Sequence, residues 1–590
     1  MAEGGVVASG INHDALHKSI RWSYRALEPF RNLNQNLIEE YAGPTYGQGL
    51  AKEKYLNKLH QAVDAYTLLL AANRPRVNVT THFDEYRPFA RKFQEAVNNL
   101  IEEIGLEITI RQWVMDAFFC IGIVKVHLAD SGPVEFETDL WMDPGTPFAS
   151  NVSLDNFFYD MSAKKWSECK YAGDMYRIPY ADIQRGIDEG IYDPETASDI
   201  RPTSKNEINA DRLEMISRGA ATDIDEYEPM VDLADVWVPR EAKIYTYPVQ
   251  KRREMVLYGE PIAEMDWEYD QSPYHLLGFN DVPENIMPLS PASHLVAIDK
   301  LINNIMRKSA RQARRAKENP IYTPAGSESA RKIQRTGDGE WVEVDSVQEI
   351  GSFKSGGVDP TNQAFMSGLL EMFDNQAGNL TALLGLGAQS DTATQEQLIH
   401  NAGSRKIGQM QYRVMDATNR LIRSLGLMLW EDNFKTITAT IPLPGFEQYT
   451  VDASWRPGDR EGDFLDYNFK VNPMSMPYRT PSQNVEMVNT VISQIYAPLM
   501  QMMMAQGGMI DFAALNESYA DNLDNPLFRN IIKFQTPSPQ LTSPSMPEGP
   551  KKPGNTTRNY VRRNVSTGGT PQARAQKQQQ GWLATARDSE

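Results

Sequence analysis

Residues 291–317 read PASHLVAIDKLINNIMRKSARQARRAK, and residues 395–431 read QEQLIHNAGSRKIGQMQYRVMDATNRLIRSLGLMLWE. Both stretches have the periodicity of long amphipathic helices, because apolar or small residues recur at spacings of three and four. At about 1.5 Å per residue, the second helix would be roughly 55 Å long. A helix of that length is typical of a chain that spans layers of an assembly, and no enzyme site explains it. The two apolar seams are Leu295, Ile298, Ile302, Ile305, Ser309, Ala313 and Ala316 in the first helix, and Leu398, Ile407, Met410, Val414, Ala417, Leu421, Leu425 and Met428 in the second.

The opposite side of the first helix collects cationic side chains. They are Lys300, Arg307, Lys308, Arg311, Arg314 and Arg315. Two interpretations stay open. The favoured one is a solvated face, or a face neutralised by carboxylates of a neighbouring subunit. The other is contact with a phosphate backbone. No aromatic residues are interleaved with these cations, so base stacking is not expected.

The segment between the two helices alternates short strands, a helix and a loop. Asn319-Pro320 ends the first helix. Short strands are expected at 321–322, 341–344 and 348–351, around a charged turn at 335–339. A helix follows over residues 360–384. The glycine-rich loop GLGAQSD at 385–391 then leads to a helix N-cap at 391–395.

The rest of the chain predicts an α+β body. Helices are expected at 12–41, 52–72, 88–105 and 108–119, and a β-hairpin at 121–128 and 134–140. Strands follow at 156–160 and 168–177, a short helix at 179–190, and a polar surface insertion at 194–229. Further strands are expected at 231–239, 242–248, 251–258, 273–279 and within 434–455. Helices at 483–506 and 511–534 precede a disordered Pro/Ser/Gly/Gln-rich tail.

The length, net charge and cysteine content of the chain limit the class of protein. A chain of 590 residues predicts two to four folding units. Its net charge of −18 argues against a protein that coats nucleic acid. Residues 536–590 hold eight Lys and Arg against three acids, so the remainder carries −18 − 5 = −23. Two cysteines make no disulfide framework, no signal peptide is expected, and the apolar runs are too short to cross a membrane.

A search for catalytic chemistry finds no site. There is no P-loop, no G-x-S-x-G elbow and no paired cysteine ligand set, and Gly385-Leu-Gly387 lacks the third glycine of a dinucleotide site. His13 and His17 are one helical turn apart, but no third metal ligand is evident, so two exposed surface histidines are the better interpretation. We therefore expect no catalytic residues, no metal and no cofactor.

The order of these elements resembles the portal proteins of tailed bacterial viruses. The resemblance covers most of residues 12–535. It rests on FFCIGIVKV at 118–126, NFFYD at 156–160 with AKK at 163–165, and the helix at 303–319. It continues with LLGLG at 383–387 before TATQE at 392–396, then NPMSM at 472–476 and the closing helices to residue 534.

The resemblance implies a dodecameric ring around a DNA channel, built from a wing, a stem, a clip and a crown. The N-terminal wing would be 1–290, the stem helices 291–317 and 358–382, and the clip 318–357. A channel loop would be 383–394, the long wing helix and wing strands 395–475, the crown 476–535, and the basic tail 536–590, whose role is open. Expected channel-loop residues are Leu383, Leu384, Gly385, Leu386, Gly387, Gln389 and Asp391. Expected docking residues of the clip are Arg335, Asp338, Trp341 and Glu343.

The resemblance also implies partners and a location. These partners are further copies of the chain, double-stranded viral DNA, the terminase large subunit, head–tail adaptor or neck proteins, the major capsid protein and a scaffolding protein. The location is the capsid portal vertex of the virion, after assembly in the host cytoplasm. An acidic body would let a duplex slide without sticking. Two alternatives remain: another virion structural protein without a DNA channel, such as an adaptor or internal core protein, and a hydrolase or nuclease with an unrecognised site.

Overall fold

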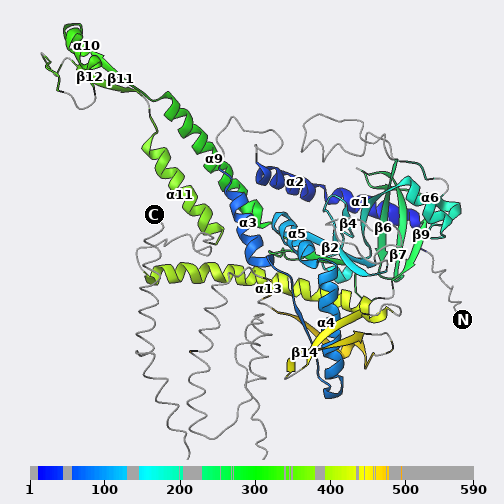
Figure 1. The fold of residues 1–590 in the computed structure, drawn as a ribbon. Helices are drawn as coiled ribbons and strands as arrows, with labels where there is room; N and C mark the ends of the chain where they lie inside the picture. The colour runs from blue at the N-terminus through cyan, green and yellow to red at the C-terminus, as the bar shows by residue number, and fades with distance from the viewer. Residues whose placement is uncertain are drawn as a thin grey trace, which may run out of the picture. The chain divides into compact units, whose positions relative to one another are not determined.

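The computed structural model combines helices and strands, so the predicted α+β class is confirmed (Figure 1). It describes residues 11–43, 56–128, 145–197, 200–202, 229–337, 341–378, 393–432, 437–455 and 460–476, together with positions 458 and 493. Short gaps fall at 253, 268, 270, 345, 347, 349, 356, 444–445, 459 and 473–474. All of these residues belong to the first of two compact units, Met1–Ile531.

Five helices precede the first large sheet. They are α1 (His13–Ala26), α2 (Glu28–Ala42), α3 (Lys58–Ala71), α4 (Arg87–Glu103) and α5 (Leu106–Phe119). Asn12 caps α1 by accepting a hydrogen bond from the Ala15 amide, and Pro29 in the first turn of α2 marks the break between α1 and α2. Gly105, at φ +58°, separates α4 from α5. All four predicted helical regions are confirmed, with α3 beginning later than expected.

Two sheets form the body beside these helices. The three-stranded sheet has the order β10-β2-β3, from Tyr274–Leu277, Gly122–Leu128 and Pro147–Asn151. The larger sheet has the order β4-β5-β6-β7-β8, with β9 also paired to β7. All neighbouring strands are antiparallel. The strands of the larger sheet are β4 (Phe157–Tyr159), β5 (Ala172–Pro179), β6 (Met230–Val238), β7 (Lys243–Lys251), β8 (Val256–Leu257) and β9 (Ala263–Asp266).

Helices α6 (Tyr180–Asp188) and α7 (Pro194–Ala197) lie between β5 and β6. The predicted strand at 134–140 and most of the predicted insertion at 194–229 lie outside the described residues. Strand β2 pairs with β3 and β10. Cys120 and Cys169 are buried free thiols, and burial raises the pKa of both to about 12.

The long third helix of the sequence pattern is α13 (Ala393–Glu431). Its predicted seam is confirmed from Ile407 onward, because Ile407, Met410, Val414, Ala417, Leu421, Leu425 and Met428 are all buried. The side chain of Leu398 lies outside the described set. Helix α13 contacts α3, α4, β3, β10 and β15 (Tyr467–Val471), so one rod packs against several layers of the body.

Two strand pairs close the described fold. Strands β13 (Ile437–Leu443) and β14 (Phe446–Trp455) confirm the strands expected within 434–455. Strand β15 pairs with β1 (Val77–Thr81), and neither strand was predicted. The partners are almost 400 positions apart, so no local pattern marks the pair. The predicted helices at 483–506 and 511–534 and the tail at 536–590 lie outside the described structure.

Candidate functional site: the α9–α11 hairpin and its tip

Helix α9 (Pro291–Arg315) is fixed to the body at its base. The Ser290 side chain caps the helix by accepting from the Ser293 amide at 3.2 Å, and its hydroxyl donates to the Phe118 carbonyl oxygen at 3.2 Å. About three turns further along, Asn303 exchanges two hydrogen bonds with the backbone of Leu56, at 2.8 and 3.2 Å. Buried polar groups need specific hydrogen-bond partners, so these contacts hold α9 in one position on the body.

Helix α11 (Pro360–Gln376) packs beside α9, and Figure 1 shows the two helices side by side. Near the base the pair is apolar, with Leu369 and Phe373 buried on α11 and Ile298 and Ile302 buried on α9. Beyond these residues lies what we call the outer hairpin, residues 304–315 of α9 and 360–368 of α11. None of its side chains is buried.

Hydrogen bonds of polar side chains join the two helices in the outer hairpin. Lys308 Nζ donates to Asn362 Oδ1 at 3.2 Å. Gln312 Oε1 accepts from the Asp359 amide and from Asn362 Nδ2, both at 3.3 Å. The Phe365 side chain is 54% exposed. Exposed polar contacts of this kind stabilise a helix pair only weakly, so the outer hairpin has no core of its own.

The six predicted basic residues are not all free of ion pairs within the chain. Lys300 forms an ion pair with Glu40 of α2 at 3.0 Å, so it is neutralised within one chain and leaves the predicted basic face. Arg311, Arg314 and Arg315 are exposed and form no ion pair with any residue that the structure describes. Lys308 is exposed beside Asn362, and Arg307 is half-buried. The predicted basic face is thus confined to the end of α9 near the tip.

The tip of the hairpin consists of a two-stranded ribbon and a short helix. Strands β11 (Lys317–Tyr322) and β12 (Ile350–Ser355) are antiparallel, with Lys317 opposite Ser355 and Tyr322 opposite Ile350. The short 3-10 turn Pro324–Gly326 and helix α10 (Ser327–Arg335) follow β11. Figure 1 shows these elements beyond one end of the α9–α11 pair.

The sequence missed one helix of the tip and predicted one strand wrongly. Helix α10 was not predicted; Glu328 in its first turn and Lys332 and Arg335 in its last turn match the helix dipole. Of the charged turn expected at 335–339, residue 335 ends α10, residues 336–337 are not helical, and residues 338–339 lie outside the described residues. The strand expected at 341–344 is absent, because its alternating WVEV pattern has no partner strand among the described residues. The strand expected at 348–351 is β12, shifted toward the C-terminus.

The predicted docking residues of the tip are accessible. Arg335, Trp341 and Glu343 are exposed, and the indole of Trp341 is fully so; Asp338 lies outside the described residues. Ile321, Tyr322 and Ile333 are also exposed apolar side chains of the tip. Single exposed apolar residues are ordinary, but four in one small element are typical of an interaction surface.

The predicted channel-loop residues Leu383, Leu384, Gly385, Leu386, Gly387, Gln389 and Asp391 lie outside the described residues. The interpretation of His13 and His17 as exposed surface residues is wrong. His13 Nδ1 lies 2.8 Å from the Tyr247 hydroxyl, and the His17 ring packs edge-on against Tyr247. Burial lowers the pKa of His17. Within the described residues, no group of three or more His, Cys, Asp or Glu could hold a metal, and no helix is long and apolar enough to cross a membrane.

A charged cluster between the two sheets was not predicted. Lys125 Nζ on β2 lies 2.8 Å from Asp174 Oδ1 and 2.7 Å from Asp235 Oδ2. Burial alone lowers the pKa of Lys125, but the two carboxylates outweigh it and raise that pKa above its usual value. The three side chains are largely buried, so the cluster links the two sheets within the body.

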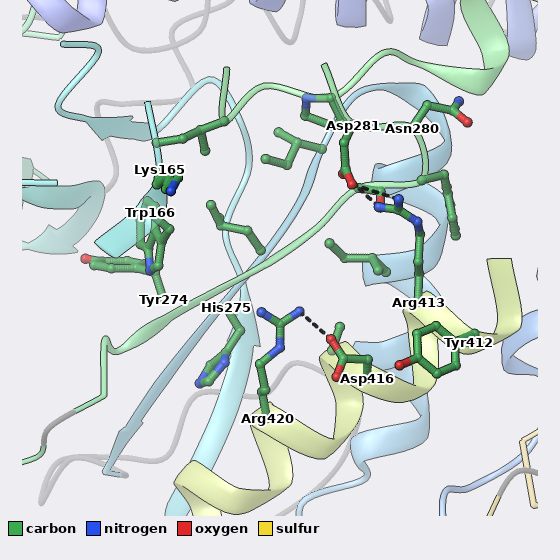
Figure 2. Close-up of a pocket in the computed structure, with 18 of the residues that line it drawn as sticks. Lys165, Trp166, Tyr274, His275, Asn280, Asp281, Tyr412, Arg413, Asp416 and Arg420 are labelled. Atoms are coloured by element: carbon green, nitrogen blue, oxygen red, sulfur yellow. Dashed lines mark hydrogen bonds and ion pairs between the residues drawn. The ribbon is translucent and has the colours of Figure 1, made fainter. Parts of the chain in front are cut away.

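A second unpredicted feature is a large open cleft of about 1480 Å³ beside α13 (Figure 2). We call it the basic cleft. Its walls are β10, the 278–288 loop, residues 164–166 and one side of α13. Figure 2 shows Arg413 directed at Asp281 and Arg420 directed at Asp416. The first pair is bidentate at 2.7 and 2.7 Å, and it lowers the pKa of Asp281; the second pair is 3.1 Å apart.

His275 lies in the wall of the basic cleft, next to Arg420. Its Nε2 atom is buried and has no hydrogen-bond partner among the described residues. Burial and the neighbouring Arg420 lower the pKa of His275 to about 3, so the ring is neutral at physiological pH. The sequence signal for this cleft was the spacing of Arg413, Arg420 and Arg423 along α13, which puts cations on one side of the helix.

Comparison with protein-family models and with curated proteins finds no match to this chain.

Proposed function

We propose that this chain is a portal protein of a tailed bacterial virus. Copies of it would form a closed ring at one capsid vertex, through which double-stranded viral DNA is packaged and ejected. The tip of the α9–α11 hairpin would dock the terminase large subunit during packaging and head–tail adaptor or neck proteins afterwards. In this proposal the wing is the body up to α9, the stem is α9 with α11, and the clip is the β11–α10–β12 tip.

The observation that carries the proposal is the outer hairpin. The α9–α11 pair is fixed to the body at its base. Its outer half, which carries the ribbon tip, has no buried side chain. Short isolated helices are marginal in water, so most helical stability in proteins comes from packing of an apolar face. Phe365 on α11 and Leu301 on α9 are about half exposed. Neighbouring copies in a ring would supply the missing packing.

The charges suit a conduit for DNA. The chain carries a net charge of −18, which disfavours tight adhesion of a duplex. Arg311, Arg314 and Arg315 form a small basic group near the end of α9 and are exposed in a single copy. They can contact a carboxylate of the next copy or a passing phosphate. The proposal needs no nucleotide site in this chain, because the motor that hydrolyses ATP would be a separate protein.

Electron microscopy of the purified full-length chain tests this proposal. We expect closed rings with an axial opening wide enough for B-form DNA. Phe365→Glu should prevent ring formation, because it places a charge on the face that the next copy covers. Leu465→Glu is the matched control: Leu465 is 72% exposed and lies in the 3-10 turn Phe464–Asp466, away from the hairpin. Rings without an axial opening would instead favour an adaptor or internal core protein.

A further inference from the structure

The basic cleft has more positive charge than its own carboxylates neutralise. Five cations line it, Lys164, Lys165, Arg413, Arg420 and Arg423, against the carboxylates Asp281 and Asp416. Lys164 also pairs with Glu284 of the 278–288 loop, at 2.9 Å. The five cations and these three carboxylates leave about two units of positive charge, in a chain whose net charge is −18. A concave site of that sign attracts an acidic group.

The cleft is also partly apolar. Tyr412 is 69% exposed at its edge, and Trp166, Leu276 and Ile286 contribute to its lining. The buried Nε2 of His275 offers a further polar atom without a protein partner. A complementary ligand would therefore carry a few carboxylates around one apolar side chain. Exposed tyrosine beside arginine is the composition found at the centres of protein interfaces.

The same chain presents a surface with those properties, which we call the acidic turn, residues 188–195, from the last residue of α6 to the second residue of α7. It reads DEGIYDPE, and no Lys or Arg occurs from Gly186 to Ile200. Its four carboxylates are exposed, and Ile191 between them is 48% exposed. The carboxylates belong to Asp188, Glu189, Asp193 and Glu195.

The acidic turn has a defined conformation before it meets any partner. Gly190 has φ +76°, which favours glycine. The Ile191 amide donates to the Gly186 carbonyl at 2.8 Å, and the Asp193 amide donates to the Ile262 carbonyl at 2.8 Å. The Tyr192 ring packs directly over Gly186, where an added Cβ would lie 2.5 Å from it. A surface that is already ordered loses little entropy on binding.

We propose that the basic cleft of one copy binds the acidic turn of the next copy of this chain. This inference rests on the ring proposed above and deepens it by naming one of its contacts. The two surfaces are built from different residues, so the contact is heterologous, and a heterologous contact with the right rotation closes into a ring. Asp188 and Glu189 would meet Lys165 and Arg420, and Ile191 would pack near Tyr412.

A nucleic-acid ligand is disfavoured by the same residues. Arg413 holds both oxygens of Asp281 at 2.7 Å, whereas Arg420 has a single contact with Asp416 at 3.1 Å and keeps donors for another carboxylate, so the cations available for new partners are few. A phosphate backbone gains affinity from many cations that each release counterions. The unneutralised charge of this cleft fits one acidic turn better than a run of phosphates.

Charge reversal with rescue tests the contact in the full-length chain. Lys165→Glu with Arg420→Glu should raise the concentration needed for half-assembly roughly tenfold or more, because like charges are then juxtaposed. Asp188→Lys with Glu189→Lys should do the same. All four changes together should restore most of the assembly. Glu85→Lys, an exposed acid of the 3-10 turn Asp84–Tyr86, is the matched control and should leave assembly unchanged.

Carbodiimide cross-linking of a mixture of isotope-labelled and unlabelled chains gives a second measurement, which does not depend on the variants. It should join Lys165 of one copy to a carboxylate in 188–195 of another, as an amide found by mass spectrometry. Rings that form without this cross-link and are unaffected by both reversals would overturn the inference and leave the portal proposal standing. The cross-link in open chains that never form a ring would support the contact and count against the portal proposal. Loss of DNA-duplex binding on Lys165→Glu with Arg420→Glu, without the cross-link, would make the cleft a nucleic-acid site and overturn the inference.

Discussion

Replacing Lys125 with Met should destabilise the body strongly, and the structure gives the reason. Asp174 and Asp235 are directly opposite each other on β5 and β6, a placement in which like charges repel. Lys125 from the other sheet contacts both carboxylates, at 2.8 and 2.7 Å. Removing one partner of a buried ion pair costs roughly 3–5 kcal/mol. The Tyr274 hydroxyl still donates to Asp174 at 2.6 Å, so we expect a loss of about 3 kcal/mol at pH 7.5.

The pH dependence distinguishes lost charge compensation from lost packing. Without Lys125 the two carboxylates are left buried and close together without a cation, which disfavours their charged forms. The variant should therefore regain stability as the pH falls from 7.5 toward 5, because protonation removes the unpaired charges. In the wild type this cluster should contribute little pH dependence over this range, since the pKa of Lys125 is raised above its usual value and its charge persists.

Urea unfolding followed by tryptophan fluorescence measures both effects. Lys243→Met is the matched control: Lys243 pairs with Glu264 at the same 2.8 Å distance, but on the surface, and its loss should be undetectable. Adding Asp174→Asn to Lys125→Met should recover part of the stability, because one unpaired carboxylate is removed. A loss below about 1 kcal/mol, or an equal loss at pH 5 and pH 7.5, would refute the assignment of this cluster as a charge-compensated link between the sheets.

Three further outcomes follow from single positions. Burial raises the pKa of Asp116 to about 7, so Asp116→Asn should raise the unfolding midpoint at pH 8, and its advantage should vanish as the pH falls toward 4, where wild-type Asp116 is protonated. Gly173→Ala should lower stability by roughly 1–3 kcal/mol, because its Cβ would lie 2.3 Å from the Asp235 carbonyl oxygen, whereas Gly368→Ala in the open interior of α11 should be neutral or stabilising in urea unfolding of the monomer. Trp341→Ala should leave the unfolding midpoint unchanged, since the side chain is fully exposed, but reduce the yield of DNA-filled particles in a packaging assay; normal yield would count against a docking role for the tip.

Local periodicity was sufficient to predict the long helices. The seam of α13 from Ile407 to Met428 is buried, and α9 begins at Pro291 as expected. Helices are set by contacts three and four residues apart, so a single stretch of sequence carries their signal. The same reasoning missed Lys300, whose partner Glu40 lies on a helix about 260 positions earlier. A cation on a helix surface is placed correctly by periodicity, but its partner is not.

Contacts between residues that are far apart in the sequence were the main feature that sequence reasoning missed. Strand β1 pairs with β15, and Lys125 meets two carboxylates from another sheet. Strand β2 is buried along most of its length, so the alternation that identifies a half-exposed strand does not show which side Lys125 occupies. The basic cleft depends on the same kind of pairing, because loop 278–288 and α13 are brought together only by the tertiary fold.

The distribution of burial connects the fold to the proposed assembly. The body encloses large side chains such as Trp113 and Phe93 completely, while the outer hairpin buries none. In one copy, the hairpin therefore depends on its base, where Asn303 and Phe373 fix it to the rest of the chain. Any partner that covers the outer hairpin stabilises it by mass action, so its order and its assembly are linked. A projecting hairpin of this kind is costly for a monomer and useful for a ring, because its unsatisfied surface is available to the next copy.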